Sequence, residues 1–250
     1  RRATLIKGIV GFGKIVDRHE VNRKVDEAVV SDIGNARVFM RRYGWYPQII
    51  HYGIEGDIFA KKPSEIANVL EKFGLDDGSF HIIQVGMISP SKNQLTTLKS
   101  IHQLKEKIPE IKVIFAGYRE EENPYTKTLE DYIRENNLAS SVLFTGHVTK
   151  TELCALYYAS HAAVFSGGWQ GSWLSPFEAL LAEKPVIVSP TIICSSLIRE
   201  QNIGLVSDDL QKAIFDVYKD YTSYLKMARK GKEFVLNNLT WENFLSLIHI

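Results

Sequence analysis

The sequence predicts an α/β domain built on a parallel sheet with helices on both of its faces. Two observations support this prediction. Six short apolar runs recur between residues 81 and 206, each suited to a buried strand. Amphipathic helical patterns separate these runs, so strands and helices alternate along the chain. This alternation is typical of βαβ units with right-handed crossovers, and six such strands make a complete doubly wound domain.

The individual elements follow from this periodicity and from helix stop signals. The predicted strands are His81–Gly86, Lys112–Ala116, Val142–Thr145, Ala162–Phe165, Pro185–Ser189 and Gly204–Val206. Helices are expected at about residues 93–107, 125–137, 150–159, 176–183, 193–200, 208–219, 222–238 and 241–248. Upstream, the pattern predicts two short apolar runs with an amphipathic segment between them, followed by a helix: Glu27–Ser31, Asn35–Tyr43, Gln48–Tyr52 and Ser64–Phe73.

A polar stretch around Ala60–Ser64 interrupts the pattern and is interpreted as a linker. We therefore interpret residues 1–60 as the last part of a preceding domain and its linker, and residues 61–238 as one Rossmann-like domain. Residues 239–250 form a closing helix whose aromatic side chains need a partner surface, so we expect it to cross back to the first domain. The chain opens without Met and its first stretch resembles mid-domain sequence, so we expect it to be part of a longer protein.

Composition restricts the class of protein. The chain has 250 residues, 45% of them hydrophobic and 24% charged, which is ordinary for a globular protein. A chain of this length can bury a substantial core without disulfides or structural metals. The two cysteines, Cys154 and Cys194, form neither a disulfide framework nor a zinc pattern, and we interpret them as small buried hydrophobic residues in a reducing compartment. No run reaches the roughly 18 apolar residues of a membrane span, and no signal peptide is visible. We therefore expect a cytoplasmic protein.

The charge is uneven along the chain. Residues 1–50 contain ten Lys or Arg and five Asp or Glu, a balance of +5, whereas the other 200 residues contain 20 and 24, a balance of −4. A basic first part fits peripheral contact with anionic lipid or with an anionic acceptor. A solvated helix face explains the same charges, and the sequence leaves both interpretations open.

In a parallel sheet, ligands bind beyond the carboxyl ends of the strands, so the residues after each strand are informative. The first predicted strand is followed by Gly86, where the backbone can turn tightly, then by Ser91 as a helix cap and Lys92 in the first helical turn. A cation there opposes the helix dipole, which indicates a bound anion such as phosphate, although a solvated Lys has the same spacing. Neither a Walker loop nor a Gly-x-Gly-x-x-Gly fingerprint is present.

A Gly-rich segment after the strand ending at Phe165 leads to a second candidate site. Ser175 is predicted as the N-cap, Pro176 as the first helical residue (N1) and Glu178 as the N3 residue that completes a capping box with Ser175. This capping role explains Glu178 completely. The backbone amides of Leu174 and Ser175 would also lie at a helix N-terminus that suits phosphate, with Glu178 in reach of sugar hydroxyls.

The stretch 166–189 resembles the signature of family 4 (group 1) retaining glycosyltransferases. That signature places two glutamates eight positions apart around Gly-x-Gly-Leu-Pro and continues as Glu-Ala-x-Ala-x-Gly-x-Pro-Val-Ile. Here Gln170 and Glu178 stand eight apart, and Gly171 and Leu174 match. Further pieces are similar in the same order: Gly53–Phe59, His81–Lys92, Val113–Gly117, Val142–Val148 and Leu239–Phe244. The resemblance covers about residues 25–245.

This resemblance implies a fold of the GT-B type, with the donor-binding domain preceded by the end of an acceptor-side domain. It implies transfer of a sugar, hexose-like, from a nucleoside-diphosphate sugar to a glycan, lipid or small-molecule acceptor with retention of configuration, as in cell-surface polysaccharide biosynthesis. The nucleotide sugar is then a substrate, and neither a cofactor, a metal nor a nucleic-acid partner is expected. Because family catalysis also needs the acceptor-side domain, we expect the 250 residues alone to be inactive.

The resemblance also implies residue roles. The donor diphosphate would meet Gly86 and Lys92, and the distal phosphate would meet the amides around Gly171, Leu174 and Ser175. Glu178 would hold the ribose hydroxyls, Val148 would lie near the base, and Gln170 would take the catalytic position that contacts the donor sugar. Trp169 and Trp173 could stack on a sugar or base, or simply pack.

Two departures from the family pattern matter. Met87 stands where the family has a diphosphate-binding Arg, and Gln170 where it has Glu. Arg119 or Lys150 are candidates to supply the missing positive charge. The departures keep two alternatives open, a non-enzymatic GT-B-like scaffolding module and a sugar-nucleotide 2-epimerase.

Overall fold

The computed structural model describes residues 24–64, 66–168 and 174–248, which form two compact units. The described residues of Arg1–Gly53 and Leu239–Ile250 belong to the first unit, and Ile54–Asn238 make up the second. The polar stretch predicted as a linker therefore lies inside the second unit. Within the described residues, no helix is both long and apolar enough to cross a bilayer.

The first unit contains a small βαβ arrangement and the last helix. β1 (Val29–Val30) and β2 (Gln48–Ile49) pair in parallel, and α2 (Ile33–Tyr43) connects them. Asp32 caps α2 by accepting a hydrogen bond from the backbone amide of Asn35 at 2.8 Å. At the other end of the unit, α12 (Trp241–Ile248) lies against Gly53, where an added Cβ would be 2.5 Å from the Cα of Trp241.

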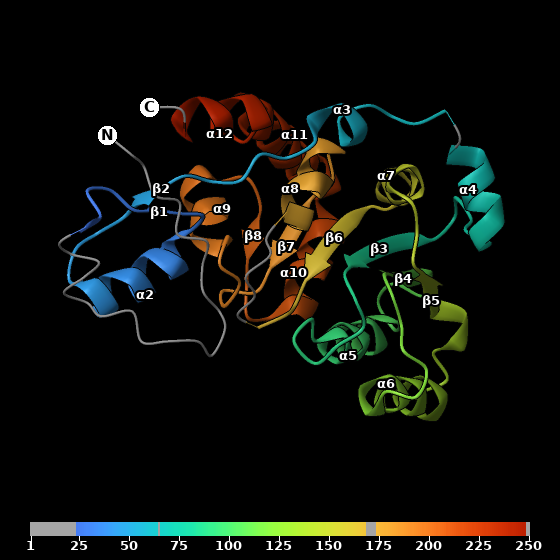
Figure 1. Ribbon diagram of the computed structural model, residues 1–250. Coiled ribbons are helices and arrows are strands. Elements are labelled where there is room, and N and C mark those ends of the chain that lie inside the picture. Colours follow the sequence, from blue (N-terminus) through green and yellow to red (C-terminus); the bar gives the residue numbers. More distant parts are fainter. Residues whose placement is uncertain (1–23, 65, 169–173, 249–250) are drawn as a thin grey trace. The chain divides into compact units, whose positions relative to one another are not determined.

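A six-stranded parallel sheet forms the centre of the second unit, with the strand order β5-β4-β3-β6-β7-β8 (Figure 1). Its strands are β3 (Phe80–Val85), β4 (Ile111–Ala116), β5 (Val142–Gly146), β6 (Ala162–Phe165), β7 (Val186–Val188) and β8 (Leu205–Val206). Its helices are α3 (Gly56–Phe59), α4 (Ile66–Phe73), α5 (Gln94–Leu104), α6 (Pro124–Glu135), α7 (Lys150–Ala159), α8 (Leu174–Leu181), α9 (Ser195–Gln201), α10 (Leu210–Lys219) and α11 (Tyr221–Asn238), with a 3-10 turn at Ala139–Ser141. The predicted α/β fold class is confirmed.

Helices cover both faces of this sheet because alternate strand residues point to opposite sides. Ile82 and Val113 belong to a buried cluster that α5 and α10 complete on one face. On the other face α7 packs on β3, and α8 packs on β6 and β7 (Figure 1). Cys154 and Cys194 are buried free thiols, as predicted.

One residue of this unit has an unusual backbone conformation. Glu183, two residues after the end of α8, has a φ of 57°, a left-handed conformation that costs a non-glycine residue about 1–2 kcal/mol. Its carboxylate pairs with Arg229 Nε at 3.1 Å and with Lys232 Nζ at 2.9 Å, and both partners lie on α11. Lys232 also donates to the carbonyl oxygen of Ala60 at 3.0 Å. These contacts hold the residue in place and tie α8, α11 and the start of the unit together.

We predict that Glu183→Ala unfolds more easily than Glu183→Gly, by about 1 kcal/mol, because both variants lose the ion pairs and only Gly relieves the left-handed backbone. Urea titrations of the two variants measure this difference in the free energy of unfolding. Equal stabilities, or a more stable Ala variant, would show that the left-handed backbone costs nothing at this position.

The buried His81 and the half-buried His161, at the amino ends of β3 and β6, make stability depend on pH. The backbone amide of His81 donates to Nδ1 of His161 at 3.1 Å, and Phe80 stacks on the His161 ring at 4.8 Å between centroids. Burial, with the neighbouring His81 and Lys184, lowers the pKa of His161 to about 4. The neutral ring is therefore the form that the folded chain favours.

A depressed histidine pKa stabilises the fold above the unfolded value of about 6.5, and this stabilisation is lost as the pH falls toward 4. We predict that the free energy of unfolding of His161→Asn, measured by urea titration, changes less than that of the wild-type chain between pH 6.5 and pH 4. Parallel curves for the two proteins would contradict this.

Candidate functional site

The strand order places a ligand crevice between β3 and β6. The chain leaves β3 toward β4 and leaves β6 toward β7, so the connections diverge to opposite sides of the sheet. Open parallel sheets bind ligands at such a switch point, beyond the carboxyl ends of the strands. Both sequence-predicted loops begin there, the first at Gly86 and the second at Ser166.

In the first loop, the side chain of Lys92 passes directly over Gly86. Gly86 has a φ of 138°, and a Cβ there would lie 2.7 Å from Cε of Lys92, so the lysine stem runs directly over it. The backbone of Gly117 at the end of β4 approaches equally closely, because its Cβ would be 2.3 Å from the carbonyl oxygen of Gly86. A side chain at either position would displace the loop or the lysine.

The helix after this loop begins later than predicted. α5 starts at Gln94, and its N-cap is Asn93 in a left-handed conformation with a φ of 55°. The predictions that Ser91 caps the helix and that Lys92 lies in its first turn are therefore wrong, since both residues precede the cap. The hydroxyl of Tyr125 on α6 accepts a hydrogen bond from the amide of Leu95 at 3.0 Å and so satisfies this helix end instead.

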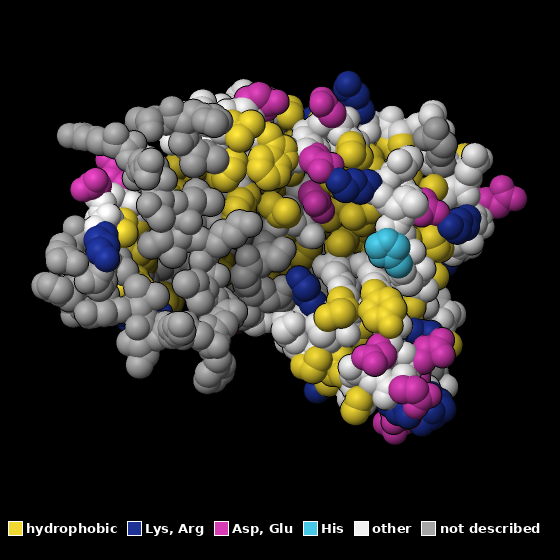
Figure 2. Space-filling view, viewed as in Figure 1, with side chains coloured by type: hydrophobic (Ala, Val, Ile, Leu, Met, Phe, Trp, Pro, Cys, Tyr) yellow, Lys and Arg dark blue, Asp and Glu magenta, His cyan; other side chains and the backbone are white. Residues whose placement is uncertain are grey.

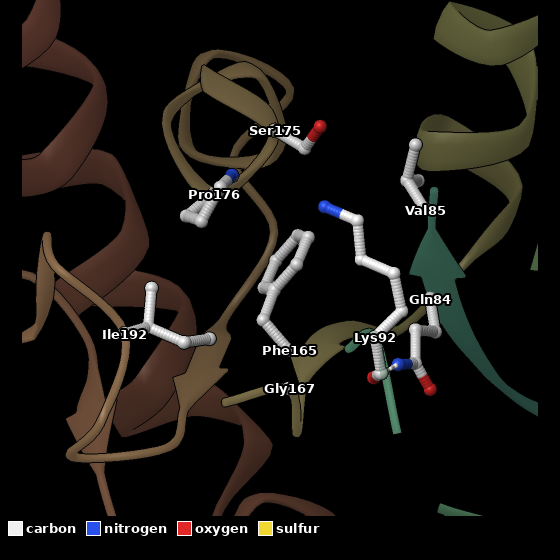
Figure 3. A pocket seen from close by; sticks show the side chains of 8 residues that line it. All are labelled: Gln84, Val85, Lys92, Phe165, Gly167, Ser175, Pro176 and Ile192. Carbon is white, nitrogen blue, oxygen red and sulfur yellow. Dashed lines mark hydrogen bonds between the residues drawn. The ribbon is translucent and has the colours of Figure 1, made fainter. Parts of the chain in front are cut away.

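Lys92 extends into a pocket toward Ser175 (Figure 3). The pocket is lined by Gln84, Val85, Lys92, Phe165, Gly167, Ser175, Pro176 and Ile192. Burial lowers the pKa of Lys92, which means that the charged ammonium is partly desolvated there. An anion in the pocket would favour the charged form of that ammonium, so the pocket suits phosphate.

The second loop supplies the start of α8. This helix already includes Leu174 and Ser175, so the prediction that Ser175 is the N-cap, with Pro176 as the first helical residue, is wrong. Gln170 and Gly171 lie outside the described residues, as do Trp169 and Trp173, and their roles stay predictions. The structure does bring Ser175 and Lys92 to one pocket, as the sequence indicated.

Glu178 lies one helical turn beyond Ser175 and is largely shielded from solvent. Burial, as the main cause, raises the pKa of its carboxyl group to about 7. The fully buried hydroxyl of Tyr157 on α7 donates to the carbonyl oxygen of Ser175 at 3.2 Å and lies 3.5 Å from Oε2 of Glu178. With this pKa the carboxyl group gains or loses its proton near neutral pH. In its ionised form it can accept hydrogen bonds from hydroxyl groups of a ligand.

The two candidates for a replacement cation are both engaged elsewhere. The guanidinium of Arg119 lies 4.9 Å from the centroid of the Phe144 ring and pairs with Glu130 at 3.3 Å. Both carboxylate oxygens of Glu55 accept hydrogen bonds from Lys150 Nζ at 2.7 Å. Acidic and basic side chains also lie interspersed on the described surface in Figure 2. Met87 is 55% exposed, and among the described residues that line the pocket Lys92 is the one cation.

Other predicted positions have a mixed outcome. Val148 lies in the connection between β5 and α7 and does not line the pocket. Gln84 and Ile192 also line the pocket, although the sequence did not predict them as site residues. A single Gln inside the apolar run of β3 was the available signal for the first, whereas Ile192 had none. Among the described residues, no three His, Cys, Asp or Glu side chains are placed to hold a metal ion.

Known proteins show similarity over most of the chain. A family profile described as "Glycosyl transferases group 1" matches residues 65–234. The alpha-monoglucosyldiacylglycerol synthase of Streptococcus pneumoniae is 24% identical over 68% of this chain and 39% of the relative. The trehalose synthase of Thermococcus litoralis is 26% identical over 75% of this chain and 46% of the relative. The chain thus spans about half the length, or less, of the curated relatives it matches.

Solved structures confirm the GT-B-type fold. Anabaena Alr3699/HepE in complex with UDP-glucose superposes with a TM-score of 0.80 at 18% identity, covering 92% of this chain and 64% of that one. A glycosyltransferase from Rickettsia africae ESF-5 gives a TM-score of 0.84 at 14% identity, covering 93% and 65%. Because the family profile matches well over half of the 250 residues, the chain belongs to the group 1 glycosyl transferases.

Proposed function

We propose that this chain is the donor-binding part of a retaining glycosyltransferase that uses a nucleoside-diphosphate sugar. The observation that carries the proposal is the pocket at the switch point, where the partly desolvated Lys92 faces Ser175 at the start of α8. A cation and a helix N-terminus that converge on one pocket suit a diphosphate. The HepE complexes with UDP and with UDP-glucose, solved on the same fold, support this choice of ligand.

In this proposal the diphosphate lies over Gly86 against Lys92, with the amides of Gly171, Leu174 and Ser175 around the distal phosphate. Glu178 accepts hydrogen bonds from the ribose hydroxyls, Val148 lies near the base and Gln170 contacts the sugar. As the glycosidic bond to the diphosphate breaks, Lys92 and the helix dipole stabilise the charge that develops on the leaving oxygen. Neither a metal nor a cofactor takes part.

The acceptor is a glycan or a lipid-linked molecule. The printed names of two relatives, the pneumococcal diacylglycerol glucoside synthase and a mycobacterial mannosyltransferase for phosphatidylinositol monomannoside, support a lipid. The balance of +5 over residues 1–50 supports peripheral contact with an anionic membrane from the cytoplasmic side. Because the chain spans only part of these relatives, we propose that transfer needs further sequence, and that the 250 residues bind donor without transferring sugar.

The first test is calorimetric titration with UDP and GDP. We expect one of them to bind, and Lys92→Ala to weaken it about ten- to a hundredfold, because a charged hydrogen bond contributes about 1.5–3 kcal/mol. Glu178→Gln tests the ribose contact in the same titration.

Lys105→Ala is the matched control, since Lys105 lies just after α5 and donates to Ser141 at 2.9 Å, at the far end of that helix from Lys92. A well-folded chain that binds neither nucleotide would favour the scaffolding module suggested by Met87. Equal losses in Lys105→Ala and Lys92→Ala would show that Lys92 has no special role.

Donor affinity should also depend on pH through Glu178. Its pKa of about 7 means that the ionised acceptor form increases as the pH rises from 6 to 8. We expect the affinity for a sugar nucleotide to rise over this range in the wild-type chain and to stay flat in Glu178→Gln. UDP-glucose, or GDP-mannose if GDP is the nucleotide bound, is the titrant, because a terminal phosphate itself titrates near pH 6. The same slope in both proteins would assign the dependence to another group.

A further inference from the structure

Four polar side chains lie at or next to the pocket and are hydrogen-bonded around the first loop. They are Gln84 on β3, Asn93 at the start of α5, Thr97 on α5 and Ser166 after β6. Gln84 is 2% exposed and Thr97 is fully buried. Buried polar groups are costly unless they are hydrogen-bonded.

These side chains bond to one another and to the backbone of the first loop. Nε2 of Gln84 donates to the carbonyl oxygen of Lys92 at 2.7 Å (Figure 3), and the hydroxyl of Thr97 donates to Oε1 of Gln84 at 2.7 Å. The Thr97 and Ser166 hydroxyl oxygens are 3.0 Å apart. The geometry satisfies both ends of the Gln84 amide inside the protein.

The same network links the first loop to the second. Ser166 Oγ donates to the carbonyl oxygen of Asn93 at 2.9 Å, and Nδ2 of Asn93 donates to the carbonyl oxygen of Ser166 at 3.2 Å. Asn93 is in the left-handed region, which Asn adopts more readily than other non-glycine residues. This reciprocal pair of hydrogen bonds offsets the cost of that conformation.

The carbonyl groups of Lys92 and Asn93 are therefore both fixed, one by β3 and the other by the residue after β6. The side chain of Lys92 leaves this fixed backbone, and its stem is confined over Gly86. A lysine side chain has four rotatable bonds. The fixed backbone and the close contact with Gly86 already restrict them, so less side-chain entropy is lost when a ligand binds.

We propose that Gln84, Asn93, Thr97 and Ser166 form a clamp that positions the ammonium group of Lys92 for the donor diphosphate. The proposal rests on the proposed function, and it assigns the four side chains as positioning residues that act through Lys92. The hydrogen bonds between Asn93 and Ser166 also fix the distance between the two loops at the switch point.

The test is a double-mutant cycle measured by calorimetry with the nucleotide that the wild-type chain binds. Ser166→Ala and Thr97→Val each remove one hydroxyl of the clamp, and Thr97→Ser keeps it. We expect Ser166→Ala and Thr97→Val to weaken nucleotide binding about three- to tenfold, and Thr97→Ser to bind like the wild-type chain. In a Lys92→Ala background the same substitutions should change the affinity less than about twofold, because the group that they position is gone.

Ser160→Ala is the matched control. Ser160 precedes β6 at the opposite end of that strand, is 2% exposed, and donates to the carbonyl oxygen of Leu156 at 2.8 Å. Ser160→Ala therefore removes a hydroxyl about as buried as that of Thr97 and far from the pocket, and it should lower thermal stability without lowering nucleotide affinity. If Ser166→Ala does not fold, the Thr97→Val and Thr97→Ser pair carries the test.

The outcomes separate the two proposals. Losses of affinity that persist in the Lys92→Ala background, or that Ser160→Ala shares, would overturn the clamp and leave the donor site intact. Unchanged affinity in both clamp variants would overturn it as well. Absence of binding to either nucleotide by the wild-type chain would overturn the proposed function and the clamp with it.

Discussion

The pairing of β3 with β6 is the constraint on which the rest of the second unit depends. These strands are far apart in sequence, and their register joins Ile82 to Ala162 and Ile83 to Ala163. Parallel pairing brings their carboxyl ends to one edge, so the loops that follow must meet there. The remaining strands extend the sheet to either side, and the helices on its two faces bury the core that keeps this pair together. The pocket is a direct product of that register.

The sequence predicted the frame of this unit well because apolar periodicity depends mainly on burial. The strand predicted at Ala162–Phe165 and the helix at 150–159 match the structure, and other boundaries shift by a few residues. The helix starts at Ser91 and Ser175 were predicted wrongly, because capping preferences are weak signals that tertiary contacts override. The left-handed backbone of Asn93, whose cost is offset by Ser166 from another strand, could not be inferred from neighbours in sequence.

The site was predictable in kind and less so in detail. Lys92 and Ser175 were expected near one ligand and do line one pocket. The engagement of Arg119 with Phe144 and Glu130 depends on where α6 packs, which no local pattern encodes. Burial disfavours the charged form of both Lys92 and Glu178, so it lowers the pKa of the amine and raises the pKa of the carboxyl group. A ligand that offers an anion to Lys92 and hydroxyl groups to Glu178 would favour the charged form of both side chains.

The contact between Lys232 and Ala60 has a mechanical consequence. It fixes α11 to the segment that begins the second unit, and close by an added Cβ on Gly56 would lie 3.3 Å from Leu236. The chain therefore enters this unit after Gly53 and leaves it after Asn238 along two neighbouring paths. Unfolding that begins at either path must break the contact that holds the other, so the first and last segments of the second unit fray together.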